Sequence, residues 1–436
     1  MNIISISVIV VFSFLLVLAT GMPVAFSLFS LAILFDLIFL GPKSLFLAFT
    51  ALYGNMDNQL FIAVPLFVLM ACLLEFSGIA SDLYETMHKW MGSLRGGLAM
   101  GTTVICALID AMSGMGATAT ITMGVLALPE MLKRKYDKSL AIGCIPCGGA
   151  LGPLIPPSII MIILGGLTGL SVGKLFIGGF IPGLLITFFF CIYISIRCLI
   201  NQNLGPPLPL EERGTWLERI ISLKGVILSI LLVFLILGGI YSGAFTPTEA
   251  GGIGAMGTFL IVLLRGKLSW NTLTKALYSS MRINAMVIWL LVGGTAYAAL
   301  LNSLGIASKL ASFLIGLPFS NLGVVCIMMF ITFLMGCFVD GASILMIATP
   351  VFFPVVNTLG IDPLWFGVIY TMAMVVGYVT PPFGMNLFYM KGLVPEGVTM
   401  KDIWSSVTPY MLLMLLGLLI CTLFPILVTW LPSLMK

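Results

Sequence analysis

Residues 110–121 read D-A-M-S-G-M-G-A-T-A-T-I, and residues 340–344 read D-G-A-S-I. Both stretches are short and polar, contain glycine, and interrupt long apolar runs. Inside a membrane, such an interruption is tolerated only where the backbone is buried in protein or lines a cavity, because unpaired amide and carbonyl groups are costly against lipid. The two stretches therefore indicate a binding site in a membrane protein.

The composition predicts an all-α polytopic membrane protein. The 436 residues are 60% hydrophobic and 8% charged, and the apolar runs recur near the roughly 20 residues that a helix needs to cross a bilayer. Strands of a β-barrel would alternate in shorter segments. The chain has a net charge of only +4, no basic tract and no GxxxxGK[ST] phosphate-binding motif. We therefore expect no nucleic-acid binding and no ATPase activity.

The first half of the chain, residues 1–200, contains spans and two interrupted segments. The arms of the segment at 94–132 are each about 15 residues long, too short for a span, and indicate a re-entrant hairpin. The segment at 139–170 is interrupted by Pro156 and Pro157, which predict a broken helix. A polar linker at 201–224, expected to be cytoplasmic, follows. The predicted spans are 4–20, 24–40, 58–77 and 175–200, and 81–95 is expected to be an interfacial amphipathic helix that contains His88.

The second half, residues 225–436, repeats this order at a constant offset of 225 residues. The matches fall on the glycines, prolines and hydroxyl residues that interrupt the helices. They pair Gly116 with Gly341, Thr118 with Ser343, Gly152 with Gly377, and the Pro-Pro sequence at 156–157 with that at 381–382. The offset predicts spans at 229–245, 249–265 and 283–302, a second hairpin at 320–357 and a second broken helix at 363–393.

The number of crossings predicts an inverted repeat. Each half contains five crossings, or seven if the hairpin arms are counted, so a linker that does not cross must leave the second half upside down. This topology places 16 of the 20 Lys and Arg residues on one side and four on the other. The positive-inside rule makes the first side cytoplasmic. We therefore expect both termini to be periplasmic, and the two hairpins to enter from opposite faces.

The breaks are the predicted ion sites. A helix broken at mid-depth exposes carbonyl groups at one end and amides at the other, which suit a cation and an anion respectively. We expect about two sodium sites, because hard cations prefer oxygen ligands; the alternative is that these small residues only allow close helix packing. The predicted ligands are Ser113, Gly116, Thr118, Gly152, Ile155 and Pro157 in the first half, and Phe338, Gly341, Ser343, Gly377, Thr380 and Pro382 in the second.

Three residues are predicted to contact a substrate: Ser158, Asp340 and Asn386. Asp340 lies beside the second tip, where it could also anchor the hairpin, and Asn386 could instead satisfy backbone freed by the break. Asp110 and Asp340 are both costly at membrane depth, which makes a functional role the default expectation for each. The offset places Asp340 on Met115, so Asp110 has no counterpart, and a local cap is the alternative for it.

Enzymatic chemistry has little support in the sequence. There is no HExxH motif and no Ser/His/Asp grouping, and the chain has a single histidine. Glu249 follows Thr246 and Pro247, a pattern typical of a helix N-terminus. We therefore expect a transporter, with no catalytic residues, and an intramembrane enzyme is the rival class.

Several blocks resemble the large membrane subunit of tripartite ATP-independent periplasmic (TRAP) transporters from one end of the chain to the other. They are V-P-L-F at 64–67, S-G-x-G-A-T at 113–118, I-P-P-S at 155–158, F-I-P-G at 180–183, F-T-P-T-E-A at 245–250, Asp340 with Pro350 and Pro354, and T-P-P-F-G-M-N-L-F at 380–388.

The resemblance implies a sodium-driven importer of organic anions, such as C4-dicarboxylates, sialic acids or other carboxylates, in the inner membrane of a bacterium or archaeon. It also implies an elevator mechanism and two partners, a small membrane subunit with four helices and a periplasmic substrate-binding protein. The family tip usually reads Ser-Gly-Ser-x-x-Ala, whereas Met115 and Gly116 leave this tip with one hydroxyl fewer. A stand-alone sodium/anion symporter or exchanger, without a binding protein, is the alternative.

Overall fold

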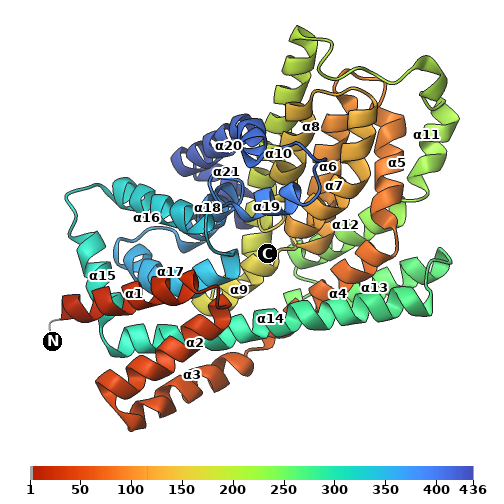
Figure 1. Ribbon diagram of the computed structural model, residues 1–436. Coiled ribbons are helices and arrows are strands. Elements are labelled where there is room, and N and C mark those ends of the chain that lie inside the picture. Colours follow the sequence, from red (N-terminus) through yellow and green to blue (C-terminus); the bar gives the residue numbers. More distant parts are fainter. Residues whose placement is uncertain (1–2, 115, 436) are drawn as a thin grey trace.

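The structure, a computed structural model, describes residues 3–114 and 116–435, and over these residues the chain forms helices and turns without any β-strand (Figure 1). The helices of the first half are α1 (Ile3–Ala19), α2 (Val24–Phe35), a π-helical turn (Asp36–Leu40), a 3-10 turn (Pro42–Ser44), α3 (Leu45–Met56), a 3-10 turn (Gln59–Ile62), α4 (Ala63–Phe76), α5 (Ile79–Met91), α6 (Gly97–Ser113), α7 (Gly116–Lys133), α8 (Lys138–Gly149), α9 (Ile159–Thr168) and α10 (Val172–Ile200).

The second half begins after a linker that contains a 3-10 turn (Leu210–Glu212) and α11 (Trp216–Leu223). Its helix order matches that of the first half at the breaks: α7 and α17 begin 225 residues apart, as do α8 and α18. The helices are α12 (Ile227–Tyr241), α13 (Pro247–Leu264), α14 (Trp270–Ser303), α15 (Ile306–Ile315), α16 (Asn321–Gly336), α17 (Gly341–Thr358), α18 (Pro363–Gly377), α19 (Met385–Lys391), α20 (Met400–Leu423) and α21 (Ile426–Ser433).

Six helical stretches of the described chain are long and apolar enough to cross a membrane: Gln59–Phe76, Val172–Ile200, Pro247–Leu264, Trp270–Ser303, Gly341–Thr358 and Met400–Leu423. A seventh is formed if α11 and α12, which meet at a 51° bend, are taken as one span. Other apolar helices, among them α6, α9, α16 and α18, have only 10–17 residues. The helix predicted at 283–302 is longer than expected, because α14 has 34 residues, and α3 was not predicted.

The long helix α14 is the support on which the rest is arranged. At a rise of about 1.5 Å per residue it is about 51 Å long, and it packs against α2, α3, α4 and α17 along its length (Figure 1). Near the N-terminal end of α14, Asp82 of α5 forms ion pairs with two residues that follow α13. They are Arg265 and Lys267, and the Nζ of Lys267 lies 2.7 Å from Asp82 Oδ2. These ion pairs join the predicted amphipathic helix of the first half to the second half.

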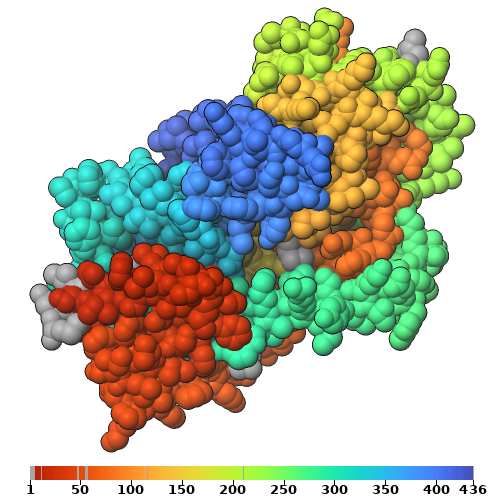
Figure 2. Space-filling model, viewed as in Figure 1, coloured from red at the N-terminus to blue at the C-terminus, as the bar shows by residue number. Residues whose placement is uncertain are grey.

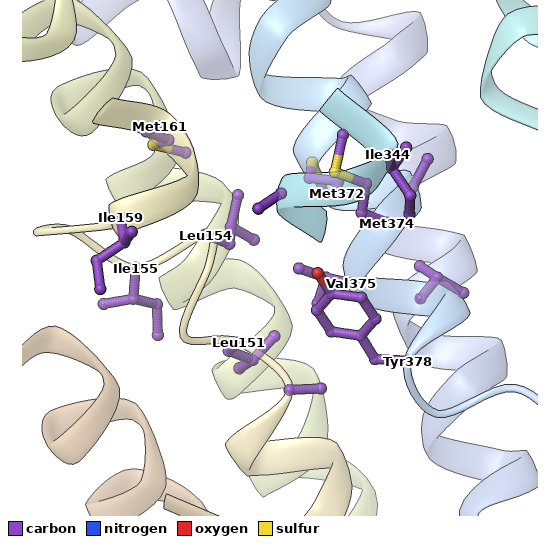
Figure 3. Close-up of a cluster of buried hydrophobic side chains, with 14 of the residues drawn as sticks. Leu151, Leu154, Ile155, Ile159, Met161, Ile344, Met372, Met374, Val375 and Tyr378 are labelled. Atoms are coloured by element: carbon purple, nitrogen blue, oxygen red, sulfur yellow. The ribbon is translucent and has the colours of Figure 1, made fainter. Parts of the chain in front are cut away.

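The broken helices of the two halves pack together. Helix α8 packs mainly against α6, α7 and α20. Helix α19 of the second half lies against α7 and α8, and α17 lies against α9. The space-filling view shows the C-terminal part of the second half (blue) in the middle of one face, between the N-terminal helices (red) and the first hairpin (orange) (Figure 2). Apolar side chains from both halves, including Leu151, Ile155, Ile344 and Met372, belong to one buried cluster (Figure 3).

Candidate anion and cation sites at the broken helices

A cavity of about 190 Å³ lies where the two tips meet the two breaks. The first residues of α7, α9 and α17 line it, namely Gly116, Ile159 and Gly341. The short helix α19 contributes Met385 and Asn386, and α14 closes the cavity with the apolar residues Ile283, Met286, Val287 and Leu290. The cavity is therefore built from both halves of the chain.

The electrostatics of this cavity suit an anion. The N-terminus of an α-helix carries unpaired amides and the equivalent of about half a positive charge, and such termini bind anions readily. Among the described residues that line the cavity there is no Lys or Arg, and Asp340 is the only charged one. An anion in the cavity would therefore be held by backbone amides rather than by cationic side chains.

Asp340 is the N-cap of α17. Its Oδ1 accepts a hydrogen bond from the backbone N–H of Ser343 at 3.1 Å, and Ser343 Oγ donates to its other carboxylate oxygen. A carboxylate at a helix N-terminus is favoured by the helix dipole as well as by the hydrogen bond. The charge of Asp340 and the hydroxyl of Ser343 are thus both used to start the helix.

The other two predicted substrate residues differ in position. Asn386 lines the cavity, and its Nδ2 donates to Thr120 Oγ1 at 3.2 Å and to the carbonyl of Pro146 at 3.1 Å. Ser158 is fully buried and caps α9: its hydroxyl accepts from Met161 N and donates to the carbonyl of Pro153. Ser158 is not among the cavity's lining residues, so the structure groups only Asp340 and Asn386 there.

The first tip is seated in the first break by close backbone contacts. A Cβ atom added to Gly116 would lie 2.3 Å from the carbonyl oxygen of Gly149, the last residue of α8. A Cβ added to Gly114 would lie 2.6 Å from the carbonyl oxygen of Pro157. The predicted ligands Gly116 and Pro157 therefore lie at the junction between tip and break, where helix C-terminal carbonyls are also present.

Ser113 and Thr118 lie on another side of the same tip. They line a small cavity of about 10 Å³, with Thr122 and with Glu75 of α4. Glu75 was not among the predicted site residues, because it ends an apolar run and lies close to the polar segment that begins at Ser81. Gly152 and Ile155 are buried within the first break.

The second tip also meets its break closely. A Cβ added to Gly377, the last residue of α18, would lie 2.6 Å from the Cα of Gly336, the last residue of α16. Thr380 Oγ1 donates to the carbonyl of Val376 at 2.7 Å. The side chain of Phe338 is exposed and packs against Phe383, with ring centroids 5.3 Å apart.

Gly341 and Pro382 complete the second set of predicted ligands. A Cβ on Gly341 would lie 2.2 Å from the Tyr378 hydroxyl. The peptide bond between Pro381 and Pro382 is cis, as is the one between Pro156 and Pro157. The contact between Gly336 and Gly377 brings the C-termini of α16 and α18 together at the second break, with the carbonyl oxygens of Phe333 and Met374 beside it.

Asp110 lies near the end of α6, next to the first tip. It is 0% exposed, and neither of its carboxylate oxygens has a hydrogen-bond partner. The described residues contain no group of three or more His, Cys, Asp or Glu that could hold a metal ion. A cation at either tip would therefore be held mainly by hydroxyl and carbonyl oxygens, with at most a few carboxylates.

Comparison with known proteins gives the family of the chain. The model of the tripartite ATP-independent periplasmic transporter, DctM component, matches residues 11–427. The C4-dicarboxylate TRAP transporter large permease protein DctM of Pseudomonas aeruginosa is 31% identical, over 88% of each chain. The sialic acid large permease protein SiaM of Vibrio cholerae is 30% identical over 97% of this chain and 98% of its own, and the ectoine/5-hydroxyectoine large permease protein UehC of Ruegeria pomeroyi is 31% identical over 83% of each.

Two solved transporters share the fold. The Alcanivorax borkumensis YdaH transporter superimposes with a TM-score of 0.64 over 99% of both chains, at 15% identity. Neisseria gonorrhoeae MtrF gives a TM-score of 0.62 at 16% identity, over 89% of this chain and 85% of its own. With the matches to the large permease proteins, which run nearly the whole length, these similarities establish that the chain belongs to the DctM family of large permease subunits of TRAP transporters, multi-pass proteins of the bacterial inner membrane that are not enzymes.

Proposed function

We propose that this transport subunit imports an organic anion by an elevator mechanism that is driven by sodium. The observation that carries the proposal is the cavity between the two tips, which the N-termini of α7, α9 and α17 line without any Lys or Arg. Backbone amides at helix N-termini bind carboxylate oxygens well. The described lining residues include no basic side chain, so the site avoids the large desolvation cost of burying one, and its one charged lining residue, Asp340, is engaged in capping α17.

The oxygen atoms near the tips fit sodium. The candidate ligands include the hydroxyls of Ser113, Thr118 and Thr380, and the carbonyl groups near Gly152 and Gly377 at the breaks. Helix C-termini favour cations in the same way that N-termini favour anions. Bound sodium would supply positive charge next to the anion and so link anion movement to the sodium gradient. The donor set consists of oxygens, which a hard cation prefers.

For the membrane topology we propose two inverted repeats, 1–200 and 225–436, with re-entrant hairpins at 94–132 and 320–357 and both termini periplasmic. The matched starts of α7 and α17, and of α8 and α18, support this arrangement. The uneven distribution of Lys and Arg over the two sides supports the orientation. In an elevator mechanism, the hairpins and broken helices would move against the helices arranged along α14.

The relatives support a proposal for the substrate and the partners. The similar permeases are named for C4-dicarboxylate, sialic acid and ectoine, and we propose a carboxylate for this chain. We further propose that it works with a small four-helix membrane subunit and a periplasmic substrate-binding protein. A stand-alone sodium/anion symporter with the same cavity is the second candidate.

Reconstitution tests the proposal. The chain and the small membrane subunit are placed in proteoliposomes, the binding protein is added outside, and uptake of succinate and of sialic acid is measured under an inward sodium gradient. We expect uptake of one carboxylate with sodium and little uptake with an equal potassium gradient. Equal uptake in both salts would contradict sodium coupling, and full uptake by this chain alone would favour the stand-alone symporter.

A further inference from the structure

Asp110 is the least satisfied charged residue that the structure describes. It is fully buried, and both carboxylate oxygens lack a hydrogen-bond partner. None of the five ion pairs formed by the described residues includes it. An ionised carboxylate buried in this way is very costly unless a positive charge lies against it. An acidic residue retained at such a place within a membrane is therefore expected to be functional.

The position of Asp110 on α6 brings it next to the first break. Cys106, Asp110 and Gly114 follow one another at intervals of four residues, so they lie along one side of the helix. Cys106 Sγ lies 3.9 Å from the carbonyl oxygen of Ile145 in α8, and Gly114 packs against the carbonyl of Pro157. Asp110 lies between these two contacts, on the side of α6 that faces the interrupted segment.

The surroundings of Asp110 carry negative partial charge. α6 ends at Ser113 and α8 ends at Gly149, and the C-terminus of each helix has unpaired carbonyl groups and the equivalent of about half a negative charge. The first-half tip has Gly116 and Thr118 where the second-half tip has Gly341 and Ser343, but Ser343 bonds to Asp340, whereas the carboxylate of Asp110 has no partner. A cation beside the first break would thus have a carboxylate and carbonyl oxygens as neighbours.

We propose that Asp110 supplies the negatively charged ligand of the cation site at the first break. This inference rests on the proposed sodium coupling and deepens it, because it assigns the charge of one site to a named residue. In contrast, the charge of Asp340 at the second tip is already used to cap α17. The two cation sites therefore differ, and the first depends on a carboxylate while the second depends on neutral oxygens.

Sodium binding to the purified permease complex tests the inference. The shift in thermal unfolding temperature is measured against sodium concentration at constant ionic strength, with potassium as the replacement salt, for the native chain and for Asp110→Asn. Because a cation that binds only the folded state stabilises it, the shift reports binding without any transport. We expect the half-saturating sodium concentration to rise about tenfold or more in Asp110→Asn, since bonds to charged groups are the stronger ones.

The matched control is Asp36→Asn. Asp36 is also buried, at 2% exposure, but it lies in the π-helical turn after α2 and lines none of the cavities at the tips. We expect this variant to keep the sodium response of the native chain. Asp110→Ser is measured in parallel, and equilibrium binding of radioactive sodium is expected to fall by one ion per chain in both Asp110 variants.

The outcomes separate this inference from the proposed function. If sodium stabilises the native chain and both Asp110 variants with equal affinity and equal stoichiometry, Asp110 is not a ligand and the inference is overturned, while sodium coupling stands. If sodium stabilises none of the proteins and radioactive sodium does not bind, the sodium coupling itself is wrong. Loss of one ion in the Asp110 variants, with an unchanged response in Asp36→Asn, supports the assignment.

Discussion

The two hairpin tips each contain an aspartate near a glycine, yet the two carboxylates lie in opposite electrostatic settings. Asp340 starts α17 and accepts a hydrogen bond from its backbone, whereas Asp110 lies near the end of α6 with no partner. A negative charge is favoured at a helix N-terminus and disfavoured at a C-terminus. Two halves with the same order of helices can therefore place their acidic residues in different electrostatic settings and give them different roles.

The largest expected effect tests what the two tips share, which is close backbone contact. Gly116→Ala and Gly377→Ala would each place a Cβ against backbone atoms, at 2.3 Å and 2.6 Å, so neither clash is relieved by moving a side chain. We expect each substitution to lower the free energy of unfolding by about 1–3 kcal/mol, and uptake to fall strongly. The measurements are thermal unfolding in detergent and uptake in proteoliposomes.

The control for these substitutions is Gly252→Ala, because a Cβ at Gly252 meets nothing within 4 Å. This variant should unfold and transport like the native chain. If only Gly116→Ala lost stability, the two tips would not share this requirement. The second tip would then accommodate a methyl group that the first does not.

A smaller effect separates the two aspartates. Asp340→Ala removes the N-cap of α17 and should lower the free energy of unfolding by about 0.5–2 kcal/mol. In a buffer without sodium, Asp110→Asn should leave stability unchanged or raise it, because it replaces an unpaired buried acid with a neutral side chain of similar size. Chemical or thermal unfolding of the two variants in potassium buffer measures this difference. A destabilised Asp110→Asn would show that the carboxylate has a partner in the folded chain.

The smallest effect is a pH dependence confined to the first half. Burial lowers the pKa of His88 on α5, and α15, which occupies the corresponding place in the second half, has no histidine. Below the ordinary pKa of about 6.5, the unfolded chain takes up a proton that the folded chain does not. Stability should therefore fall as the pH drops from about 6.5 toward the lowered pKa of the folded state.

His88→Gln checks this dependence, because glutamine does not titrate. Thermal unfolding measured between pH 8 and pH 5 should show a shallower loss of stability in His88→Gln than in the native chain. Identical profiles would mean that other groups account for the whole effect of acid.

Helix ends beside glycine and proline can be expected from the sequence, because these residues act locally. Proline removes a backbone donor and restricts the residue before it, so the end of α8 and the start of α9 around Pro156 follow from the sequence. The cap formed by Thr246 and Glu249 is confirmed as a capping box with hydrogen bonds in both directions. Such features depend on neighbours within a few residues.

Features that depend on distant packing were missed or undervalued. The predicted span begins at residue 283, where polar residues give way to apolar ones. The helix α14 begins earlier, at Trp270, because its N-cap is Ser269. For Asp110 the sequence left a functional role and a local cap both open, since the offset gave it no counterpart. Whether a carboxylate has a partner depends on what the fold places beside it, and the sequence does not contain that information.

The hydrogen bond from Asn386 to Pro146 has a consequence for how the protein is made. The two residues are 240 positions apart, and at a synthesis rate of about 5–20 residues per second the second arrives about 12–48 s after the first. During that interval α8 has been synthesised, but α19 and α20, which pack against it in the folded chain, have not. A membrane insertase or a chaperone that shields the exposed break during this time should therefore raise the yield of folded permease.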